Sequence, residues 1–218
     1  MARPADLHAK LDLLRAAEEV FVEHGLDQSR VEEITARAGK SKGAFYLHFQ
    51  SKEDAFRQIV EGMLTRLATC MGDQAPLGAD WLQRWHEKDQ EILEFMWQNR
   101  KLVRLVMAGG KSADFVFLID DFANRACKQL EEFITHAVAA GVFRGDRDVR
   151  VLASAISGAY DRVIRDLVLT DEHPDFRYLS KQLQLFVLGG VAVPSVPSES
   201  HHMGSPSWPA TTVPAVKK

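Results

Sequence analysis

The sequence predicts an all-α fold, and three observations lead to this prediction. Apolar residues recur every three or four positions through most of the chain, which is the spacing that puts them on one face of an α-helix. Serine or aspartate precedes several of these segments and glycine follows them, as expected at the starts and ends of helices. No segment alternates apolar and polar residues for long enough to predict a strand.

The first two predicted helices occupy residues 7–25 and 29–38. The first ends at Gly25, because glycine suits the left-handed conformation of a helix end. The second opens with Ser29, whose hydroxyl is expected to cap the helix while Glu32 reaches back, the pattern of a capping box. Gly39 supplies the next stop. The apolar positions of the two helices are Leu7, Leu11, Leu14, Ala17, Val20, Phe21, Val31, Ile34 and Ala38.

The third predicted helix is very short, and the fourth follows it closely. Ser41 opens the third helix, which runs to Phe49. Ser51 and Asp54 then form a second capping-box pattern at the start of the fourth. A supporting helix followed by two short helices and a glycine-containing turn is the layout of a helix-turn-helix, whose second short helix enters the major groove of DNA.

A larger helical region follows, with predicted helices over residues 81–107, 114–140, 148–169 and 176–188. After Gly190 the chain becomes rich in proline, serine and threonine, a composition that buries too little apolar surface to order itself. The sequence therefore predicts a helix-turn-helix domain over residues 1–51, a larger helical domain over 52–190 and a disordered tail over 191–218.

Composition and charge exclude several classes of protein. The formal net charge is −3 and the sequence pI is about 6.2, so any binding to nucleic acid must come from a local patch. Cys70 and Cys127 lie far apart without metal-ligand spacing, as reduced thiols of a cytosolic protein do. No signal peptide is expected, because the first residues lack a continuous apolar segment, and no apolar run is long enough to cross a bilayer. We expect a soluble, cytoplasmic protein without a membrane partner.

The apolar side chains of the short helix divide between two faces. At about 100° per residue, Phe45 and Phe49 fall on one face and are predicted to anchor the helix to the core. Ala44 and Leu47 fall on the outward face, where they are expected to pack against thymine methyl groups. Direct recognition of bases by this helix is therefore predicted to be partly apolar.

Groups that suit phosphate flank this outward face. Lys42 and Tyr46 lie on one flank and His48 on the other, where their tips can reach the two walls of a groove. Gly43 permits close approach of a phosphate to the free N–H groups at the helix N-terminus. Residues 1–52 contain eight basic and eight acidic residues, but no acid lies between Ile34 and Lys52. We therefore predict a local positive surface around the short helix.

The segment from Ala16 to Phe56 reads AAEEVFVEHGLDQSRVEEITARAGKSKGAFYLHFQSKEDAF. It resembles the DNA-binding signature of the tetracycline-repressor (TetR) family of bacterial transcription regulators, above all in AGxSKGxFYxHFxSKEDxF. The resemblance implies a homodimer that binds a palindromic operator on double-stranded DNA and is released by a small-molecule effector held in the larger, dimerising domain. It implies a repressor rather than an enzyme, without cofactor, catalytic site or metal site. The residues expected at DNA are Ser29, Arg30, Lys40, Ser41, Lys42, Gly43, Ala44, Tyr46, Leu47, His48 and Lys52.

Two positions depart from the family pattern. Lys40 stands in the turn where the family usually has an apolar residue, and Thr35 stands where it usually has alanine. Lys40 removes an apolar contact from the turn and offers a phosphate contact instead.

Two other functions remain open on the sequence alone. An all-α enzyme or metal-binding bundle would need inward acids and histidines, but the helical regions contain neither HExxH nor a Glu-x-x-His pair. His201 and His202 lie in the Pro- and Ser-rich tail, which is not expected to hold them on one face. A dimeric interaction module without DNA binding would tolerate the loss of Lys42 and Tyr46.

The larger region has two further features of interest. Trp81 and Trp85 lie one helical turn apart, and such a stripe is either core or the wall of a ligand cavity. Small residues in the helix over 148–169 allow another helix to approach closely, either within one subunit or, together with the last helix, across a dimer axis. These small residues are Ala153, Ser154, Ala155, Ser157, Gly158 and Ala159.

Overall fold

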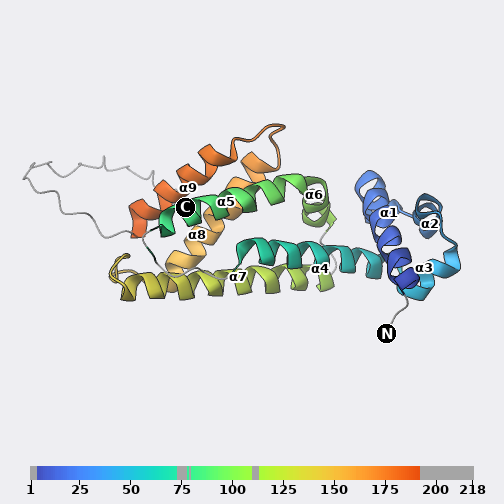
Figure 1. The fold of residues 1–218 in the computed structure, drawn as a ribbon, viewed down its shortest axis with the longest axis horizontal. Coiled ribbons are helices and arrows are strands. Elements are labelled where there is room, and N and C mark those ends of the chain that lie inside the picture. Colours follow the sequence, from blue (N-terminus) through green and yellow to red (C-terminus); the bar gives the residue numbers. More distant parts are fainter. Residues whose placement is uncertain (1–3, 73–77, 79, 110–112, 192–218) are drawn as a thin grey trace, which may run out of the picture.

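The computed structural model shows an elongated arrangement of helices (Figure 1). It describes residues 4–72, 78, 80–109 and 113–191. These residues form nine α-helices and one π-helical turn without any strand, so the predicted all-α fold is confirmed. In Figure 1, α1, α2 and α3 cluster at one end, α4 leads away from them, and α5, α8 and α9 lie toward the other end.

The N-terminal unit is built from α1 (Pro4–Gln28), α2 (Val31–Ala38) and α3 (Lys42–His48). α1 packs against the other two helices, and its side chains Leu13 and Phe21 are fully buried. The predicted end of the first helix at Gly25 is a kink after which one more turn follows, and Gly25 has a φ of +77° there. A side chain at this position would be strained in that conformation.

The start of α2 differs from the predicted capping box. The N-cap residue is Arg30, and its N–H donates to the Glu33 carboxylate at 3.3 Å. Ser29 is buried, and its hydroxyl donates to the carbonyl oxygen of Gly25 at 2.5 Å. The prediction was wrong because a carbonyl at the end of α1 competes successfully for the Ser29 hydroxyl.

α3 and α4 (Lys52–Met71) begin where the sequence predicted. The hydroxyls of Ser41 and Ser51 each accept the backbone N–H three residues later, both at 3.2 Å. Asp54 reaches back to the N–H of Gln50 at 3.0 Å rather than to that of Ser51. The capping box at α4 is therefore present in part, with the acid satisfying a donor one residue earlier than predicted.

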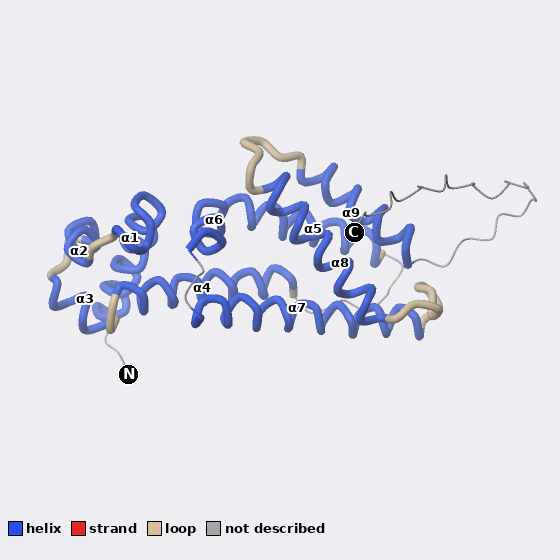
Figure 2. The backbone as a smooth tube through the Cα atoms, turned by 180° about the vertical axis from the view of Figure 1, so that it is seen from behind, coloured by secondary structure: helices blue, strands red, loops and turns tan. Residues whose placement is uncertain are grey.

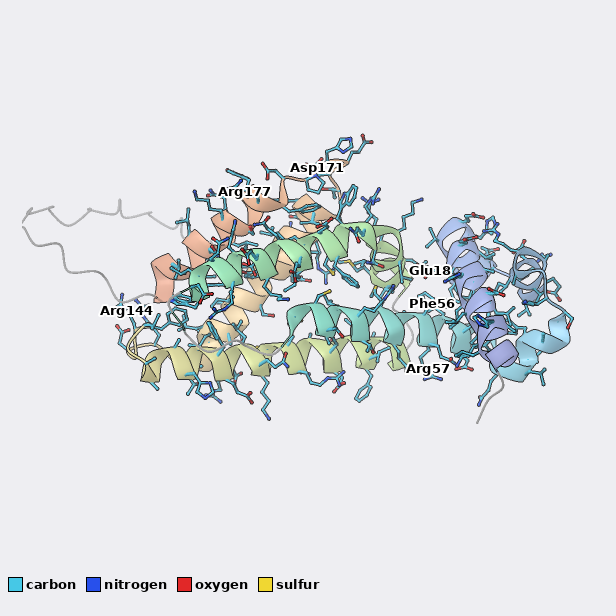
Figure 3. All side chains as sticks on the ribbon, viewed as in Figure 1. Glu18, Phe56, Arg57, Arg144, Asp171 and Arg177 are labelled. Atoms are coloured by element: carbon cyan, nitrogen blue, oxygen red, sulfur yellow. The ribbon has the colours of Figure 1, made fainter. Side chains whose placement is uncertain are left out.

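The first turns of α4 belong to the core of the N-terminal unit. Ala55 and Phe56 are buried there, and the rings of Phe21 and Phe56 meet edge to face with centroids 5.6 Å apart. Figure 3 shows Phe56 at this junction, with Arg57 beside it on α4. The N-terminal core thus continues past residue 51 into the helix that connects the two ends of the molecule.

The larger unit differs from the prediction around Asn99. The region predicted as one helix over 81–107 is two helices, α5 (Trp81–Gln98) and α6 (Arg100–Gly109). The break lets α6 turn toward α1, where Leu102 and Val103 join the N-terminal core. Burial of the apolar face of α6 against another part of the chain explains a break that no glycine or proline marks.

The remaining helices are α7 (Ala113–Ala139), α8 (Val149–Val163) with its π-helical turn (Ile164–Val168), and α9 (Phe176–Val191). α5 packs against α9 and α7 packs against α8, while α7 runs beside α4, as Figure 2 shows from behind. A second core holds these helices together, with Ile134, Phe143, Ile156 and Val187 at its centre. The larger unit is therefore a bundle with its own hydrophobic core.

Four further expectations concern membrane helices, metal sites, the cysteines and the C-terminal tail, and the described residues test them only in part. None of the described helices is long and apolar enough to cross a membrane. The described residues contain no cluster of three or more His, Cys, Asp or Glu that would hold a metal ion. Cys70 and Cys127 are free cysteines. The predicted tail lies outside the described residues apart from Val191, and so do His201 and His202.

Candidate functional site

The outward face of α3 exposes apolar side chains. Leu47 is 81% exposed, the most of any large apolar side chain in the described residues, and Tyr46 is 52% exposed. Phe45 and Phe49 are 0% and 2% exposed, and their ring centroids lie 5.0 Å apart. The two phenylalanines hold the helix to the core and leave Tyr46 and Leu47 toward solvent, as the sequence predicted.

The N-terminus of α3 is open to a ligand. Gly43 is exposed, and the nearest atom to a methyl group built on it would be the Ser41 Oγ at 3.8 Å. The first backbone N–H groups of a helix have no partner within the helix, so they favour an anion such as phosphate. Ala44 is half-buried, and it is therefore less outward than the sequence predicted.

Acidic side chains pair with the cations around α3. Lys42 Nζ lies 2.5 Å from Glu32 Oε1, and this hydrogen bond raises the pKa of Lys42 and lowers that of Glu32. Two further pairs are Arg37 with Glu23 at 2.7 Å and Lys40 with Asp12 at 3.2 Å. The acids come from α1 and α2, so the surface predicted to be positive from the local sequence is balanced by acids brought from elsewhere in the unit.

Lys52 and Ser29, both expected at DNA, instead form hydrogen bonds to backbone carbonyl groups of the N-terminal unit. Lys52 Nζ donates to the carbonyl oxygens of Leu26, Asp27 and Ser29 at 2.8, 2.9 and 3.1 Å. An ammonium group has three donors, so all of them are used at the end of α1. Ser29 is only 3% exposed. Both side chains brace the turn after α1, an arrangement that differs from the expected contact with phosphate.

The other predicted residues remain near the surface. Arg30 is exposed at the start of α2, and His48 is half-buried with its ring centroid 6.1 Å from that of Phe49. Thr35, which departs from the family pattern, is buried, and its hydroxyl donates to the carbonyl of Glu32 at 3.1 Å. Sequence reasoning missed Glu32 as the partner of Lys42, because the ten-residue separation follows no helical spacing.

A second candidate site is a cavity of about 170 Å³ in the larger unit. Four rings wall it, two from α5 and two from α7 and the loop after it: Trp81, Trp85, Phe133 and Phe143. Arg84 and Lys88 on α5 also border it. The two rings of the predicted tryptophan stripe pack against the second core and also line this cavity. The two cations were not singled out by the sequence analysis.

A buried carboxyl group lies on α5 near the cavity. Asp89 is 4% exposed, and its Oδ2 accepts a hydrogen bond from the Tyr160 hydroxyl of α8 at 2.6 Å. Burial raises the pKa of Asp89 to about 7, although hydrogen bonds from Tyr160 and Trp85 act in the opposite direction. Burial also raises the pKa of Tyr160 well above its usual value. The pair links α5 to α8 through a group that titrates near neutral pH.

Known sequences resemble the N-terminal unit more closely than they resemble the rest of the chain. Residues 13–59 match the family model described as bacterial regulatory proteins, tetR family. The HTH-type transcriptional repressor BepR of Brucella suis biovar 1 (strain 1330) is 48% identical over 48 residues, covering 22% of this chain and 23% of BepR. The fatty acid metabolism regulator protein of Bacillus subtilis (strain 168) is 23% identical over 185 residues, which covers 83% of this chain and 94% of the relative.

Solved structures extend the likeness to nearly the whole described chain. SmeT of Stenotrophomonas maltophilia, in a structure named as its triclosan complex, aligns with a TM-score of 0.69 at 19% identity. That alignment covers 90% of this chain and 99% of SmeT, and at this identity it shows a shared fold. Residues 13–59, which include the helix-turn-helix of α2 and α3, therefore match the N-terminal segment of the tetR family of bacterial regulatory proteins.

Proposed function

We propose that this chain is a ligand-responsive transcription repressor that binds a palindromic DNA operator as a homodimer. The observation that carries the proposal is α3 itself, which lies within the family-matched segment and presents Leu47 and Tyr46 outward while Phe45 and Phe49 are buried. A helix anchored in this way can enter a major groove with its apolar and phenolic side chains foremost. The proposed role is regulatory, not enzymatic, and acts on DNA in the cytoplasm.

The proposed DNA contacts follow from exposure and charge. Lys42 and Arg30 would contact phosphates, and Leu47 would contact a thymine methyl group. Lys52 and Ser29 leave this set because their donors are used inside the unit. The remaining proposed contacts are Lys40, Ser41, Gly43, Ala44, Tyr46 and His48.

The proposed dimer uses the faces of α8 and α9 that are left exposed in one subunit. Val151 on α8 is 66% exposed, and Leu185 and Phe186 on α9 are 55% and 61% exposed. Gly158 on α8 is also exposed, and a side chain built there would meet nothing within 4 Å, so it leaves room for a close helix. Two copies joined at these faces would set the spacing of the two α3 helices, which must be about 34–36 Å for adjacent half-sites.

The cavity between α5, α7, α8 and α9 is the proposed effector site. SmeT, which shares the fold, has been solved with triclosan, and an effector at this place in the present chain would act by binding one dimer conformation more tightly than another. α6 reaches from α5 to α1 and packs on both units. A shift of α5 around an effector would therefore be transmitted to the N-terminal unit.

The proposed domain organisation keeps the predicted boundaries, although the core of the first domain extends into α4. Residues 1–51 form the DNA-binding unit, 52–190 the effector and dimerisation unit, and 191–218 a tail. The first turns of α4 contribute Ala55 and Phe56 to the N-terminal core. A fragment ending at residue 51 would lose this part of its core, so isolated DNA-binding units should extend into α4.

A mobility-shift experiment tests the proposed function. The purified full chain is mixed with DNA from the region upstream of its own gene at low salt, without added small molecules, and a discrete shifted complex is expected. Leu47→Ala should reduce the preference for the specific site over a scrambled site by about 1–3 kcal/mol and leave the salt dependence unchanged. Absence of a specific complex with the wild-type chain would count against the repressor proposal.

A further inference from the structure

The rings around the cavity form a closed cycle. Trp81 and Trp85 stack with centroids 5.9 Å apart and planes 18° from parallel. Phe133 lies 6.4 Å from Trp85 and 5.9 Å from Phe143, and Phe143 lies 5.9 Å from Trp81, with edge-to-face geometry in each case. A planar aromatic guest suits such a wall, because aromatic rings pair favourably in both offset-stacked and edge-to-face arrangements.

The described charges at the cavity have a single sign. Arg84 and Lys88 lie one helical turn apart on α5 and border the cavity, and its described lining contains no acidic residue. Both cations are held at the surface by acids outside that lining, Arg84 by Asp80 and Lys88 by Glu91 at 2.7 Å. The side chains of Arg84 and Lys88 are 38% and 41% exposed. An anionic guest can therefore exchange with exposed acids of the protein at low cost.

The size of the cavity limits the guest. At about 170 Å³ it is smaller than the sites of about 300–1,000 Å³ that hold drug-sized ligands. A body of one or two fused rings fits this volume better than a long chain or a polycyclic compound. Aromatic walls, a cationic edge and a small volume all point to the same chemistry.

We propose that the effector is a small aromatic organic anion, with one or two rings packed against the wall formed by the tryptophan and phenylalanine side chains and a carboxylate or phenolate at Arg84 and Lys88. This inference rests on the proposed ligand-responsive function and names the chemical class of its effector. A cationic aromatic compound is disfavoured by the two cations, and a neutral one would form no ion pair with them.

Direct binding to the full chain, measured by calorimetry at pH 7.5 without DNA, tests the chemistry. The probes are 1-naphthoate, the neutral 1-naphthamide and the cationic 1-naphthylmethylammonium, which share one ring system. Naphthoate is expected to bind at least about tenfold more tightly than the other two. Equal or tighter binding of the amide or the ammonium compound, tighter binding of dodecanoate, or no binding at all would overturn the proposal.

Variants locate the anion within the chain. Lys88→Gln is expected to weaken naphthoate about fivefold and to leave the weak binding of naphthamide unchanged. Lys128→Gln is the matched control, because Lys128 on α7 borders a different and more open depression. A loss of affinity in Lys128→Gln with none in Lys88→Gln would place the anion elsewhere and overturn the assignment.

A DNA readout separates this inference from the function on which it rests. If naphthoate binds at the cavity and releases the chain from its operator, the result supports both the anionic effector and ligand-controlled repression. Binding that depends on Lys88 but leaves the DNA complex intact supports the chemical class and counts against ligand-controlled release. If a neutral or cationic compound releases the chain from its operator and naphthoate does not bind, the result supports the repressor proposal and overturns the proposal that the effector is an anion.

Discussion

Lys42 and Lys52 carry the same side chain ten residues apart, but the fold gives them different partners. Lys42 pairs with one carboxylate on an exposed surface, with its side chain 55% exposed. Lys52 donates to three carbonyl oxygens at the end of α1. One ammonium can exchange its partner for a phosphate, whereas the other would have to leave three unsatisfied acceptors behind.

Replacing Lys52 by methionine is therefore expected to destabilise the chain. The change keeps most of the apolar stem but removes the three donors, which should lower the free energy of unfolding by about 1–3 kcal/mol. Denaturant unfolding checks the value, with Lys42→Met as the matched control that should change stability little. Equal stability of the two variants would contradict the bracing role of Lys52.

Glu32 is expected to weaken DNA binding in the wild-type chain. Its carboxylate holds Lys42 in the free protein and would lie near a phosphate in the complex, so Glu32→Gln should tighten operator binding about two- to fivefold at low salt. The gain should shrink as salt is raised, because exposed charges are screened. Titrations by fluorescence anisotropy measure the effect.

The control for Glu32 is Glu61→Gln, which removes another paired carboxylate, from α4. This variant should bind DNA as the wild type does. If both changes tightened binding equally, the effect would come from net charge and not from the Glu32–Lys42 pair.

At the scale of elements, the link between α5 and α8 depends on a buried carboxyl group. Asp89 has a folded-state pKa of about 7, against an ordinary value of 3.8. Between these two pH values the folded chain keeps a proton that the unfolded chain has released, so stability falls as pH rises through this window. The loss is at most about 1.4 kcal/mol for each pH unit and is complete above the folded-state pKa.

Asp89→Asn should flatten this pH dependence. The amide stays neutral and can still accept the hydrogen bond of Tyr160, so the variant should gain stability relative to wild type on going from pH 5 to pH 8. Guanidinium unfolding at the two pH values measures the difference. Asp120→Asn, which changes an exposed carboxyl group on α7, should follow the wild-type profile. A wild-type profile for Asp89→Asn would mean that Asp89 is not the titrating group.

At the scale of the whole molecule, the proposed function requires two copies in a fixed relation. α8 and α9, which carry exposed apolar side chains, lie toward the end of the molecule away from α3 (Figure 1). Contacts there would therefore control the separation of two distant recognition helices. The long α4 and the crossing helix α6 connect these ends through the cores of both units.

Phe186→Asp is expected to convert the proposed dimer into monomers and to abolish the proposed specific DNA complex. The change places a charge on an apolar face that would be desolvated in the dimer. Sedimentation velocity measures the mass, and mobility shift measures DNA binding. Phe117→Asp, at a 72% exposed position on α7, is the matched control and should remain dimeric. Dimers of Phe186→Asp that still bind the operator would show that the interface lies elsewhere.

The local sequence was sufficient to predict much of the N-terminal unit. The bounds of α3, its serine cap and the burial of Phe45 and Phe49 depend on residues within one or two turns, which interact in the same way wherever the helix lies. The break at Asn99 was missed because it depends on the packing of α6 against α1. The cap of α2 was misplaced by one residue because Ser29 has a partner in the preceding helix.

The sequence by itself determined the helical class, the helix-turn-helix and the outward side chains of its second helix, because helical periodicity and capping act over a few residues. Only the tertiary structure decided how charge is distributed around α3. The segment between Ile34 and Lys52 contains no acidic residue, but acidic side chains of α1 and α2 lie beside it and pair with its cations. Electrostatic interactions depend on distance in space, so a segment without acids does not by itself make a positive surface.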